Sequence, residues 1–241
     1  NTKVGKDISF ESIKKDFDAV ILGIGAWVST GVGCPGEDAD GVIGGIDFLR
    51  KVIKKQETNL GESVAIVGGG NTAMDACRTA VRLGAKKVYN IYRRTKDEMP
   101  ADALEIKEAE EEGIIFKNLT NPLEIIKDEK GHVKQVKLQI MELGEPDASG
   151  RRAPKPVEGK TETLDVDNMI LAIGQAVDVA GLEGFDLTRK KGIVYDKDTF
   201  MTSMEGVFAG GDCGNDKISI AVEAIADATK LAPIVDAYIR G

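Results

Sequence analysis

The sequence predicts an α/β fold built on parallel β-strands. Residues 64–67 form an apolar run that ends in three glycines and passes directly into a helix-forming stretch, and a second apolar run follows at residues 87–92. Two further runs, residues 17–26 and 168–175, are apolar without alternation. Continuous apolar strands are typical of parallel sheets that are covered on both faces. At 241 residues, the chain has room for one large or two modest domains.

The first expected strand, residues 17–26, runs into a glycine turn that no helix with the three-glycine spacing follows. We therefore do not expect a phosphate loop there, nor after the similar strand at residues 168–175. Residues 33–45 are rich in glycine and acidic residues, and they are expected to cross between domains. A helix should follow over residues 46–56, because its apolar residues share one face.

The glycine turn after residue 67 has the outline of a dinucleotide-binding turn. Gly68 would let the chain bend tightly off the strand, Gly70 would let bare backbone approach a pyrophosphate, and Ala73 would allow close packing of helix on strand. The phosphates would then bind the first free N–H groups of the helix. The alternative is a glycine triplet kept for steric reasons only. The expected nucleotide-binding residues are Gly68, Gly69, Gly70, Asn71, Thr72 and Ala73.

The helix after this turn carries boundary signals of its own. Thr72 with Asp75 resembles a capping box at its start. Gly84 stands where a residue of left-handed conformation would end it. The order of strand, turn, helix and strand supports the nucleotide-binding interpretation over the steric one.

Arg93 and Arg94 follow the strand at residues 87–92 directly. A site for NAD normally ends this strand in a carboxylate that binds the ribose hydroxyls, whereas two guanidinium groups suit a 2′-phosphate dianion. The alternative is a solvated basic corner. The position at the carboxyl end of the second strand favours NADP.

After Arg94 the sequence predicts a further helix and strand, and then a series of strands separated by turns. Pro100 suits a first helical turn, so a helix is expected over residues 101–112, with a strand at residues 114–116. Three later strands, separated by turn signals, indicate an antiparallel meander: residues 123–126, 133–141 and 161–164. Arg151, Arg152 and Lys155, in the expected loop at residues 144–159, are interpreted as solubilising residues in preference to phosphate ligands.

The carboxyl end repeats the pattern of a strand followed by glycine. Residues 206–212 read Gly-Val-Phe-Ala-Gly-Gly-Asp, and a long helix is expected from Ser219 to about Arg240, with a kink at Pro233. Asp212 could bind a cofactor hydroxyl at the edge of the sheet, or it could cap the following turn. The residues alone leave both roles open.

Charge and composition exclude several classes of partner. The net charge is −8, which disfavours nucleic acid and anionic membranes, because the long-range field would repel both. No apolar run approaches the roughly 20 residues that span a bilayer, and the amino-terminal residues of the sequence do not have the charged-then-apolar pattern of a leader, so we expect a cytoplasmic protein. The first residue is not Met, so the chain is expected to be part of a longer polypeptide.

Catalytic side chains and metal ligands are not expected. Cys34, Cys77 and Cys213 are scattered and never form a Cys-x-x-Cys pair, which disfavours a local redox disulfide and an iron–sulfur cluster held by this chain alone. His132 is the only histidine and follows Gly131 in an expected hairpin turn. Zinc chemistry and Ser-His-Asp chemistry are therefore not expected.

In this order, the segments resemble the flavin- and NADPH-linked oxidoreductases of the glutamate synthase small (beta) subunit type, within the pyridine nucleotide–disulfide oxidoreductase superfamily. The resemblance runs almost end to end, and several motifs in one order are far more specific than any one alone. The matching segments are residues 17–27 (Phe-Asp-Ala-Val-Ile-Leu-Gly-Ile-Gly-Ala-Trp), 35–38 (Pro-Gly-Glu-Asp), 68–75 (Gly-Gly-Gly-Asn-Thr-Ala-Met-Asp), 92–94 (Tyr-Arg-Arg), 98–101 (Glu-Met-Pro-Ala) and 206–212.

The resemblance implies two nested three-layer dinucleotide-binding domains, with an NADP domain inserted in a partial FAD domain. Residues 1–40 and 167–241 would belong to the FAD domain, and residues 41–166 would form the NADP domain with its meander. Asp212 would hydrogen-bond a flavin ribityl hydroxyl, and the helix beginning near Ser219 would aim its positive end at the flavin ring. The further cofactor-binding residues that the resemblance implies are Gly25, Gly174, Gly211, Asp212, Ser219 and Ile220.

The implied function is hydride transfer from NADPH to FAD, with onward delivery of electrons to a partner redox subunit such as the glutamate synthase large subunit. The Gly-x-Gly-x-x-Gly turn that would bind the FAD pyrophosphate is absent, as is the family's cysteine-rich iron–sulfur domain. We therefore expect this chain to hold FAD weakly or not at all, and to be inactive alone. The alternative is a non-enzymatic NADP-binding or assembly module. A self-sufficient dehydrogenase ranks last, because no proton-transfer residue is evident.

Overall fold

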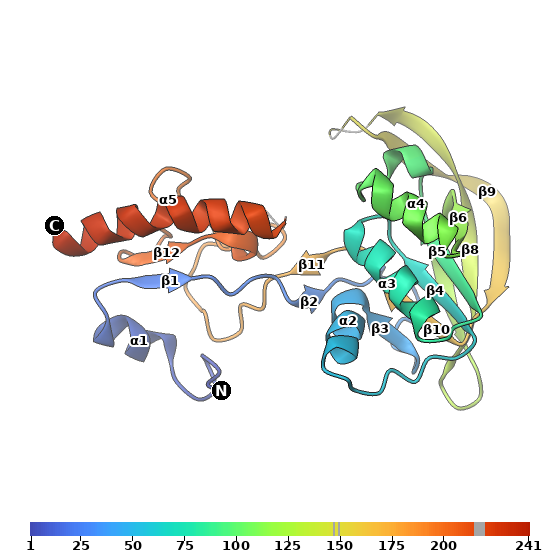
Figure 1. Cartoon of the computed structure of the whole chain (residues 1–241), viewed down its shortest axis with the longest axis horizontal. Coiled ribbons are helices and arrows are strands. Elements are labelled where there is room, and N and C mark those ends of the chain that lie inside the picture. Colours follow the sequence, from blue (N-terminus) through green and yellow to red (C-terminus); the bar gives the residue numbers. More distant parts are fainter. Residues whose placement is uncertain (147, 149, 215–219) are drawn as a thin grey trace. The chain divides into compact units, whose positions relative to one another are not determined.

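The computed structural model describes residues 1–146, 148, 150–214 and 220–241. The chain divides into two compact units (Figure 1). Unit 1 consists of Asn1–Val28 and Gln175–Gly241, and unit 2 is the continuous segment Ser29–Gly174. Unit 2 is thus inserted between the two segments of unit 1.

Unit 2 is built on a parallel sheet of five strands, in the order β3-β10-β4-β5-β6. This sheet, together with the helices on it, confirms the predicted α/β fold. Its strands are β3 (Val42–Gly44), β4 (Ser63–Val67), β5 (Lys87–Tyr92), β6 (Ile115–Asn118) and β10 (Asn168–Leu171). β10 pairs with both β3 and β4, so the run at residues 168–171 belongs to unit 2, whereas the sequence analysis assigned residues from 167 onward to the flavin domain.

Helices cover one face of this sheet and an antiparallel sheet covers the other (Figure 1). The alternation along β4 shows the two faces: Val64 and Ile66 pack with the helices, and Ala65 and Val67 pack with the antiparallel strands. All four side chains are buried, which explains why this strand reads as one apolar run. The helices are α2 (Gly45–Ile53), α3 (Asn71–Arg82) and α4 (Ala103–Glu111), with the short helix η1 (Lys96–Glu98) before α4.

The antiparallel meander is present, but its strands are longer than expected. β7 (Thr120–Lys127), β8 (Val133–Pro146) and β9 (Arg152–Asp165) form it in that order. Most of the expected loop at residues 144–159 is therefore strand. Pro154 and Pro156 signalled a loop, but they lie on β9, an edge strand, where a residue without an N–H is tolerated.

Several helix boundaries differ from the predicted ones. Gly70 is the N-cap of α3 and no side chain caps this helix, so the capping box expected at Thr72 and Asp75 was wrong. α4 begins at Ala103, with Asp102 accepting a hydrogen bond from the N–H of Leu104 at 2.8 Å, so Pro100 precedes the helix. Gly84 has φ +97° and follows α3 as predicted.

Unit 1 is smaller and contains a two-stranded parallel sheet, β1 (Val20–Leu22) with β12 (Val207–Ala209). Its helices are α1 (Phe10–Asp16), which the sequence analysis missed, the short η2 (Gly211–Cys213) and α5 (Ala221–Arg240). α5 contains Pro233, and its Leu231 and Val235 are buried in the core of this unit. The segments at the boundary with unit 2 form a further sheet, β2 (Val28–Ser29) with β11 (Gln175–Ala176).

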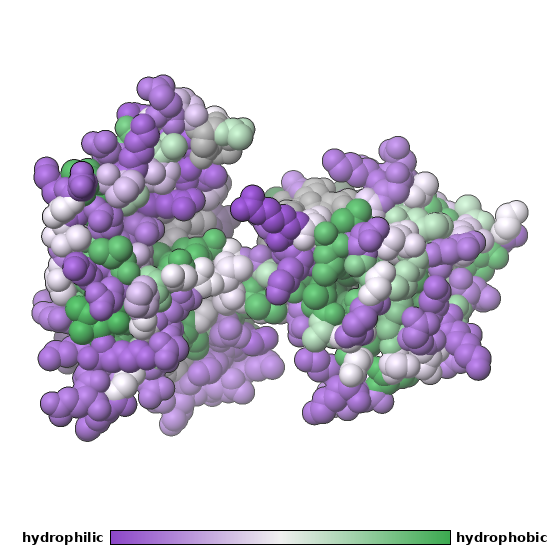
Figure 2. Space-filling model, turned by 180° about the vertical axis from the view of Figure 1, so that it is seen from behind, coloured by the Kyte–Doolittle hydropathy of each residue, from purple (hydrophilic) through white to green (hydrophobic). Residues whose placement is uncertain are grey.

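Unit 1 also leaves large apolar side chains uncovered. Figure 2 shows hydrophobic residues gathered on the face of this unit that is in view. Parallel sheets are normally covered on both faces, which a two-stranded sheet with one long helix does not achieve. The large apolar side chains of unit 1 that are more than half exposed are Phe17, Ile21, Trp27, Ile220, Val222, Ile225 and Ile239. None of the helices in the described part of the chain has the length and apolar character needed to cross a membrane.

An ionic cluster joins α3 to α4 within unit 2. The guanidinium of Arg78 pairs with Glu105 and Glu108, both at 2.7 Å, and with Glu112 at 2.8 Å. Arg82 pairs with the same oxygen of Glu112 at 2.7 Å. Partial burial opposes the ionised form of Glu112, but the hydrogen bonds from the two arginines outweigh it and lower the pKa of this carboxyl.

We predict that Glu112→Gln lowers the free energy of unfolding at pH 7 by about 1–2 kcal/mol, because it removes charge-assisted hydrogen bonds. A carboxyl whose pKa is lowered by folding stabilises the protein above its unfolded pKa, near 4.3 for Glu. This contribution is lost as the pH falls through the folded value. The difference between variant and wild type should therefore shrink below about pH 4. Urea unfolding at several pH values measures it, with Glu111→Gln as control because Glu111 is exposed and its ion pair, with Lys107, is long at 3.7 Å. A difference that stays constant with pH would contradict this assignment.

Candidate functional site

The glycine turn lies at the carboxyl end of β4 and is tightly packed on one side. Gly68 has φ +142°, and a Cβ placed on it would lie 2.2 Å from the carbonyl oxygen of Ala172. A Cβ on Gly69 would lie 2.5 Å from the ring of Tyr92. A Cβ on Gly70, by contrast, would meet no heavy atom within 4 Å. Gly68 and Gly69 are therefore required by the packing of the protein itself, and Gly70 is not.

A buried side chain fixes the turn from beneath. Asn90 lies on β5, is fully buried, and donates from Nδ2 to the carbonyl of Gly68 at 2.8 Å. The N–H of Gly68 donates to the carbonyl of Ile91 at 3.0 Å. Asn90 was not among the predicted site residues. An amide within a buried apolar strand is nevertheless a signal, because a buried polar group is normally kept for its hydrogen bonds.

The N-terminus of α3 opens directly above this turn. Ala73 is fully buried, and its N–H donates to the carbonyl of Gly70 at 2.9 Å. Asn71 does not cap the helix, because its Oδ1 accepts a hydrogen bond from the N–H of Asp102 at 2.9 Å. The N–H of Ala101 donates to the carbonyl of Gly69 at 3.1 Å. The segment before α4 is thus held beside the turn, and the N-cap residue of α3, Gly70, provides no side-chain cap for the positive end of this helix.

The two adjacent arginines at the end of β5 occupy different environments. Arg93 is exposed, and no acidic side chain in the described part of the chain pairs with it. Arg94 is 4% exposed, and its Nε donates to the carbonyl of Arg152 at 2.7 Å. The pairing of Val67 on β4 with Ile91 on β5 brings the glycine turn and Arg93 to the same edge of the sheet.

The residues expected near FAD are distributed differently. Gly211 and Asp212 lie in η2, directly after β12 of unit 1, and Gly25 lies after β1 with φ +69°. Gly174, with φ +147°, belongs to unit 2, where its carbonyl accepts the N–H of Thr30 at 3.1 Å. Ile220 is the N-cap of α5 and is 56% exposed. Ser219 lies outside the described residues.

A buried carboxylate supports the turn that carries Asp212. Asp227, on α5, is 7% exposed and accepts the N–H of Gly211 on Oδ2 at 3.1 Å. The thiol of Cys213 donates to the carbonyl of Leu22 at 3.1 Å, which ties η2 to β1. Asp227 was not among the residues predicted to have a role. Its signal would have been an acidic residue on the apolar side of the helix.

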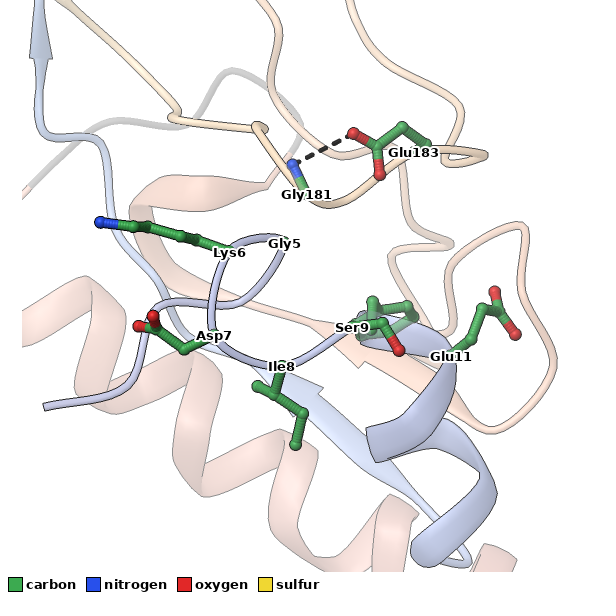
Figure 3. A pocket seen from close by; sticks show the side chains of 9 residues that line it. Gly5, Lys6, Asp7, Ile8, Ser9, Glu11, Gly181 and Glu183 are labelled. Atoms are coloured by element: carbon green, nitrogen blue, oxygen red, sulfur yellow. Dashed lines mark hydrogen bonds between the residues drawn. The ribbon is translucent and has the colours of Figure 1, made fainter.

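A surface pocket of about 390 Å³ lies elsewhere in unit 1 (Figure 3). Gly5 and Gly181 meet at its edge, where a Cβ on Gly5 would lie 2.3 Å from the Cα of Gly181. The N–H of Gly181 donates to the carboxylate of Glu183 at 3.2 Å. None of the expected cofactor-binding residues lines this pocket. Its lining residues are Gly5, Lys6, Asp7, Ile8, Ser9, Phe10, Glu11, Gly181 and Glu183.

Comparison with known proteins agrees with this geometry. A family model described as pyridine nucleotide-disulphide oxidoreductase matches residues 3–228. The chain belongs to this family. Its sequence is 43% identical to the NADP(+)-dependent formate dehydrogenase subunit beta of Moorella thermoacetica, over 100% of this chain and 34% of that protein. It is 38% identical to the glutamate synthase [NADPH] small chain of Escherichia coli, over 96% of this chain and 52% of that protein. The resemblance inferred from the motifs is therefore confirmed.

Solved structures confirm the fold. The chain matches FprA from Mycobacterium tuberculosis in complex with NADPH with a TM-score of 0.80 and 20% identity, over 99% of this chain and 66% of that one. It also matches thioredoxin reductase from T. acidophilum with a TM-score of 0.69 and 19% identity, over 92% of this chain and 66% of that one. The chain spans from about a third to about half of the length of the two curated relatives named above.

The name of this family refers to disulfide chemistry, but the cysteines of this member are separate. Cys34 is half-buried, Cys77 and Cys213 are buried, and all three are free. Burial raises the pKa of each thiol, which keeps it protonated. No group of three His, Cys, Asp or Glu side chains among the described residues could hold a metal ion. Near the glycine turn, the described residues leave open space at Gly70, and Arg93 is exposed without an acidic partner among them.

The contrast between Gly68 and Gly70 leads to a prediction about stability. Gly68→Ala should lower the free energy of unfolding by more than about 2 kcal/mol, because its Cβ would collide with backbone at a positive φ. Gly70→Ala should change it by less than about 0.5 kcal/mol, because its φ of −94° is ordinary and its Cβ enters open space. Chemical denaturation of the two variants measures both values. Equal destabilisation would show that Gly70 is also required for packing.

Proposed function

We propose that unit 2 binds NADPH and that the chain is part of an NADPH-dependent flavoprotein oxidoreductase. The observation that carries the proposal is the combination of open space at Gly70, an uncapped positive end of α3, and an unpaired guanidinium at Arg93, all at one edge of the sheet. Backbone N–H groups at a helix N-terminus bind pyrophosphate, and Arg binds phosphate dianions by paired hydrogen bonds.

The roles of the individual residues follow from their contacts. Gly70 lets the pyrophosphate approach the backbone of Asn71 and Thr72, while Gly68 and Gly69 hold the turn against Ala172 and Tyr92. Arg93 provides the charge that distinguishes NADPH from NADH. Ala73 keeps α3 close to β4. None of these residues exchanges a proton with the reacting atoms, so the chain contributes binding and orientation.

In unit 1 we propose that Asp212, held by the turn that Asp227 supports, binds a flavin ribityl hydroxyl. The residues present fit only part of an FAD site, because the sheet at β1 and β12 has two strands and the described residues include no second glycine-rich turn of the NADP type. FAD, when bound, supplies the capacity to accept a hydride and pass on electrons. The partner would be another redox subunit, and the glutamate synthase large subunit is the candidate.

We predict that the chain binds NADPH more tightly than NADH, and that Arg93→Ala removes this preference. Loss of a hydrogen bond to a charged group, about 1.5–3 kcal/mol, corresponds to a rise of about 10- to 100-fold in the dissociation constant of NADPH. The dissociation constant of NADH should stay within about twofold. Titration by intrinsic fluorescence or calorimetry measures both.

Lys87→Ala is the matched control, because Lys87 is an exposed cation at the opposite end of the same strand. This variant should bind both coenzymes as the wild type does. Gly70→Val should weaken NADPH and NADH equally, since the pyrophosphate is common to both. Failure of the wild-type chain to bind NADPH, or equal losses for both coenzymes in Arg93→Ala, would refute the proposal.

We predict that the chain purified alone carries far less than one FAD per chain, by visible flavin absorbance, and does not reduce an artificial acceptor with NADPH. The complete polypeptide with FAD should oxidise NADPH in the same assay. Near-stoichiometric flavin on the 241-residue chain would contradict the first expectation. An inactive complete protein would favour a non-enzymatic NADP-binding module.

A further inference from the structure

The adjacent arginines differ in what they can offer a ligand, and this difference deepens the proposed function on which it rests. Arg93 is exposed and without an acidic partner in the described part of the chain, whereas only 4% of Arg94 is exposed. Both residues lie in a bend beyond the last residue of β5. Their exposures show that one guanidinium is presented to solvent and the other is turned into unit 2.

Arg94 connects two elements that are far apart in the sequence. Its Nε donates to the carbonyl of Arg152 at 2.7 Å, and Arg152 is the first residue of β9, paired with Pro146 at the end of β8. The side chain of Arg152 in turn donates to the carbonyls of Leu143 at 3.0 Å and Gly144 at 3.3 Å. The end of the β8–β9 hairpin is thereby fastened through Arg94 to the segment that follows β5.

The segment that carries Arg93 is fixed on both sides. The hydroxyl of Tyr92 donates to the carbonyl of Glu98 at 2.8 Å, and the carbonyl of Arg94 accepts the N–H of Leu119 at 3.0 Å. Glu98 and Thr95 form a capping box, in which the N–H of Thr95 donates to the carboxylate at 3.1 Å. Arg93 thus stands between two anchored neighbours, which reduces the entropy lost when its side chain binds a ligand.

We propose that Arg94 is a positioning residue, which clamps the β8–β9 hairpin to the end of β5, and that Arg93 is the single cation of this pair that contacts the coenzyme 2′-phosphate. A buried guanidinium is stable only while its hydrogen bonds are kept. Release of Arg94 toward a ligand would break its hydrogen bond to the carbonyl of Arg152 and detach the hairpin from the segment that follows β5. In this pair, Arg93 therefore binds the ligand and Arg94 supports the hairpin.

The positioning role of Arg94 can be tested without any coenzyme. Arg94→Met keeps the aliphatic stem and removes the donor, and Arg94→Lys keeps the charge but loses the planar donor group. Amide hydrogen exchange at residues 143–145, 152, 153 and 155 should become about tenfold faster or more in both variants. The matched variant Arg93→Met should exchange as the wild type does. Unchanged exchange in Arg94→Met would overturn the inference.

The ligand role is tested by the salt dependence of NADPH binding. Salt screens a direct contact between an exposed cation and a phosphate. Arg93→Met should therefore flatten the rise of the NADPH dissociation constant with salt. Arg94→Met and Arg94→Lys should keep the wild-type slope, whatever their affinity. A slope flattened in Arg94→Met as much as in Arg93→Met would overturn the inference.

A measurement on the wild-type chain covers the case in which an Arg94 variant does not fold. With ¹⁵N-labelled arginine, the Nε–H signal of Arg93 should shift on addition of 2′,5′-ADP but not of AMP. The Nε–H signal of Arg94 should be protected from exchange and unmoved by either probe. A shift of Arg94 as large as that of Arg93 would overturn the inference. If the wild type bound neither NADPH nor 2′,5′-ADP, the proposed function would be refuted. The exchange experiment would still show whether Arg94 stabilises the β8–β9 hairpin.

Discussion

The close approach of the glycine turn to the strands on either side is the constraint on which the rest of unit 2 depends. Gly68 lies against the carbonyl that follows β10, and Gly69 lies against the ring of Tyr92 at the end of β5. A side chain at either position would push α3 away from the sheet. Because both contacts are with backbone or a buried ring, the start of α3 is set by the sheet itself and not by a capping side chain. A helix end that is held in this way can stay open to an anion.

This constraint links packing to chemistry through the register of the sheet. β4 and β5 run parallel with Val67 opposite Ile91, so the residues that follow each strand emerge at the same edge. Asn90 secures the carbonyl of Gly68 from within the core, and the segment before α4 is held by Asn71 and Gly69. The proposed pyrophosphate site and the cation at Arg93 are therefore parts of one connected arrangement. Rigid presentation of binding groups reduces the entropy that a ligand must otherwise overcome.

Much of this arrangement could be predicted from the sequence, because the strongest signals are local. The apolar run, the three glycines and the arginine pair gave the strand, the turn and the end of the second strand, and β4, β5 and Gly84 lie where expected. The pairing of strands that are far apart in the sequence was harder to predict. The run at residues 168–171 resembles that at residues 17–26, yet β10 pairs inside unit 2 and β1 inside unit 1. Pro154 and Pro156 are compatible with a loop or an edge strand, and only the pairing with β8 decides between them. The role of Asn90 likewise depends on a carbonyl 22 positions away.

The arginine pair shows the limit of reading a motif as a set of equivalent residues. Two identical side chains next to each other have the same charge, the same reach and the same preference for phosphate, so composition cannot separate them. Their surroundings in the folded chain separate them, since one side chain is exposed and the other is buried. Tyr92 turns inward beneath Gly69, Arg93 turns outward, and Arg94 turns inward to a carbonyl of the antiparallel sheet. This difference in burial is the basis for the different roles proposed for Arg93 and Arg94. A variant with both arginines replaced would lose the proposed phosphate contact and the support of the hairpin together. Only the single variants separate these two effects.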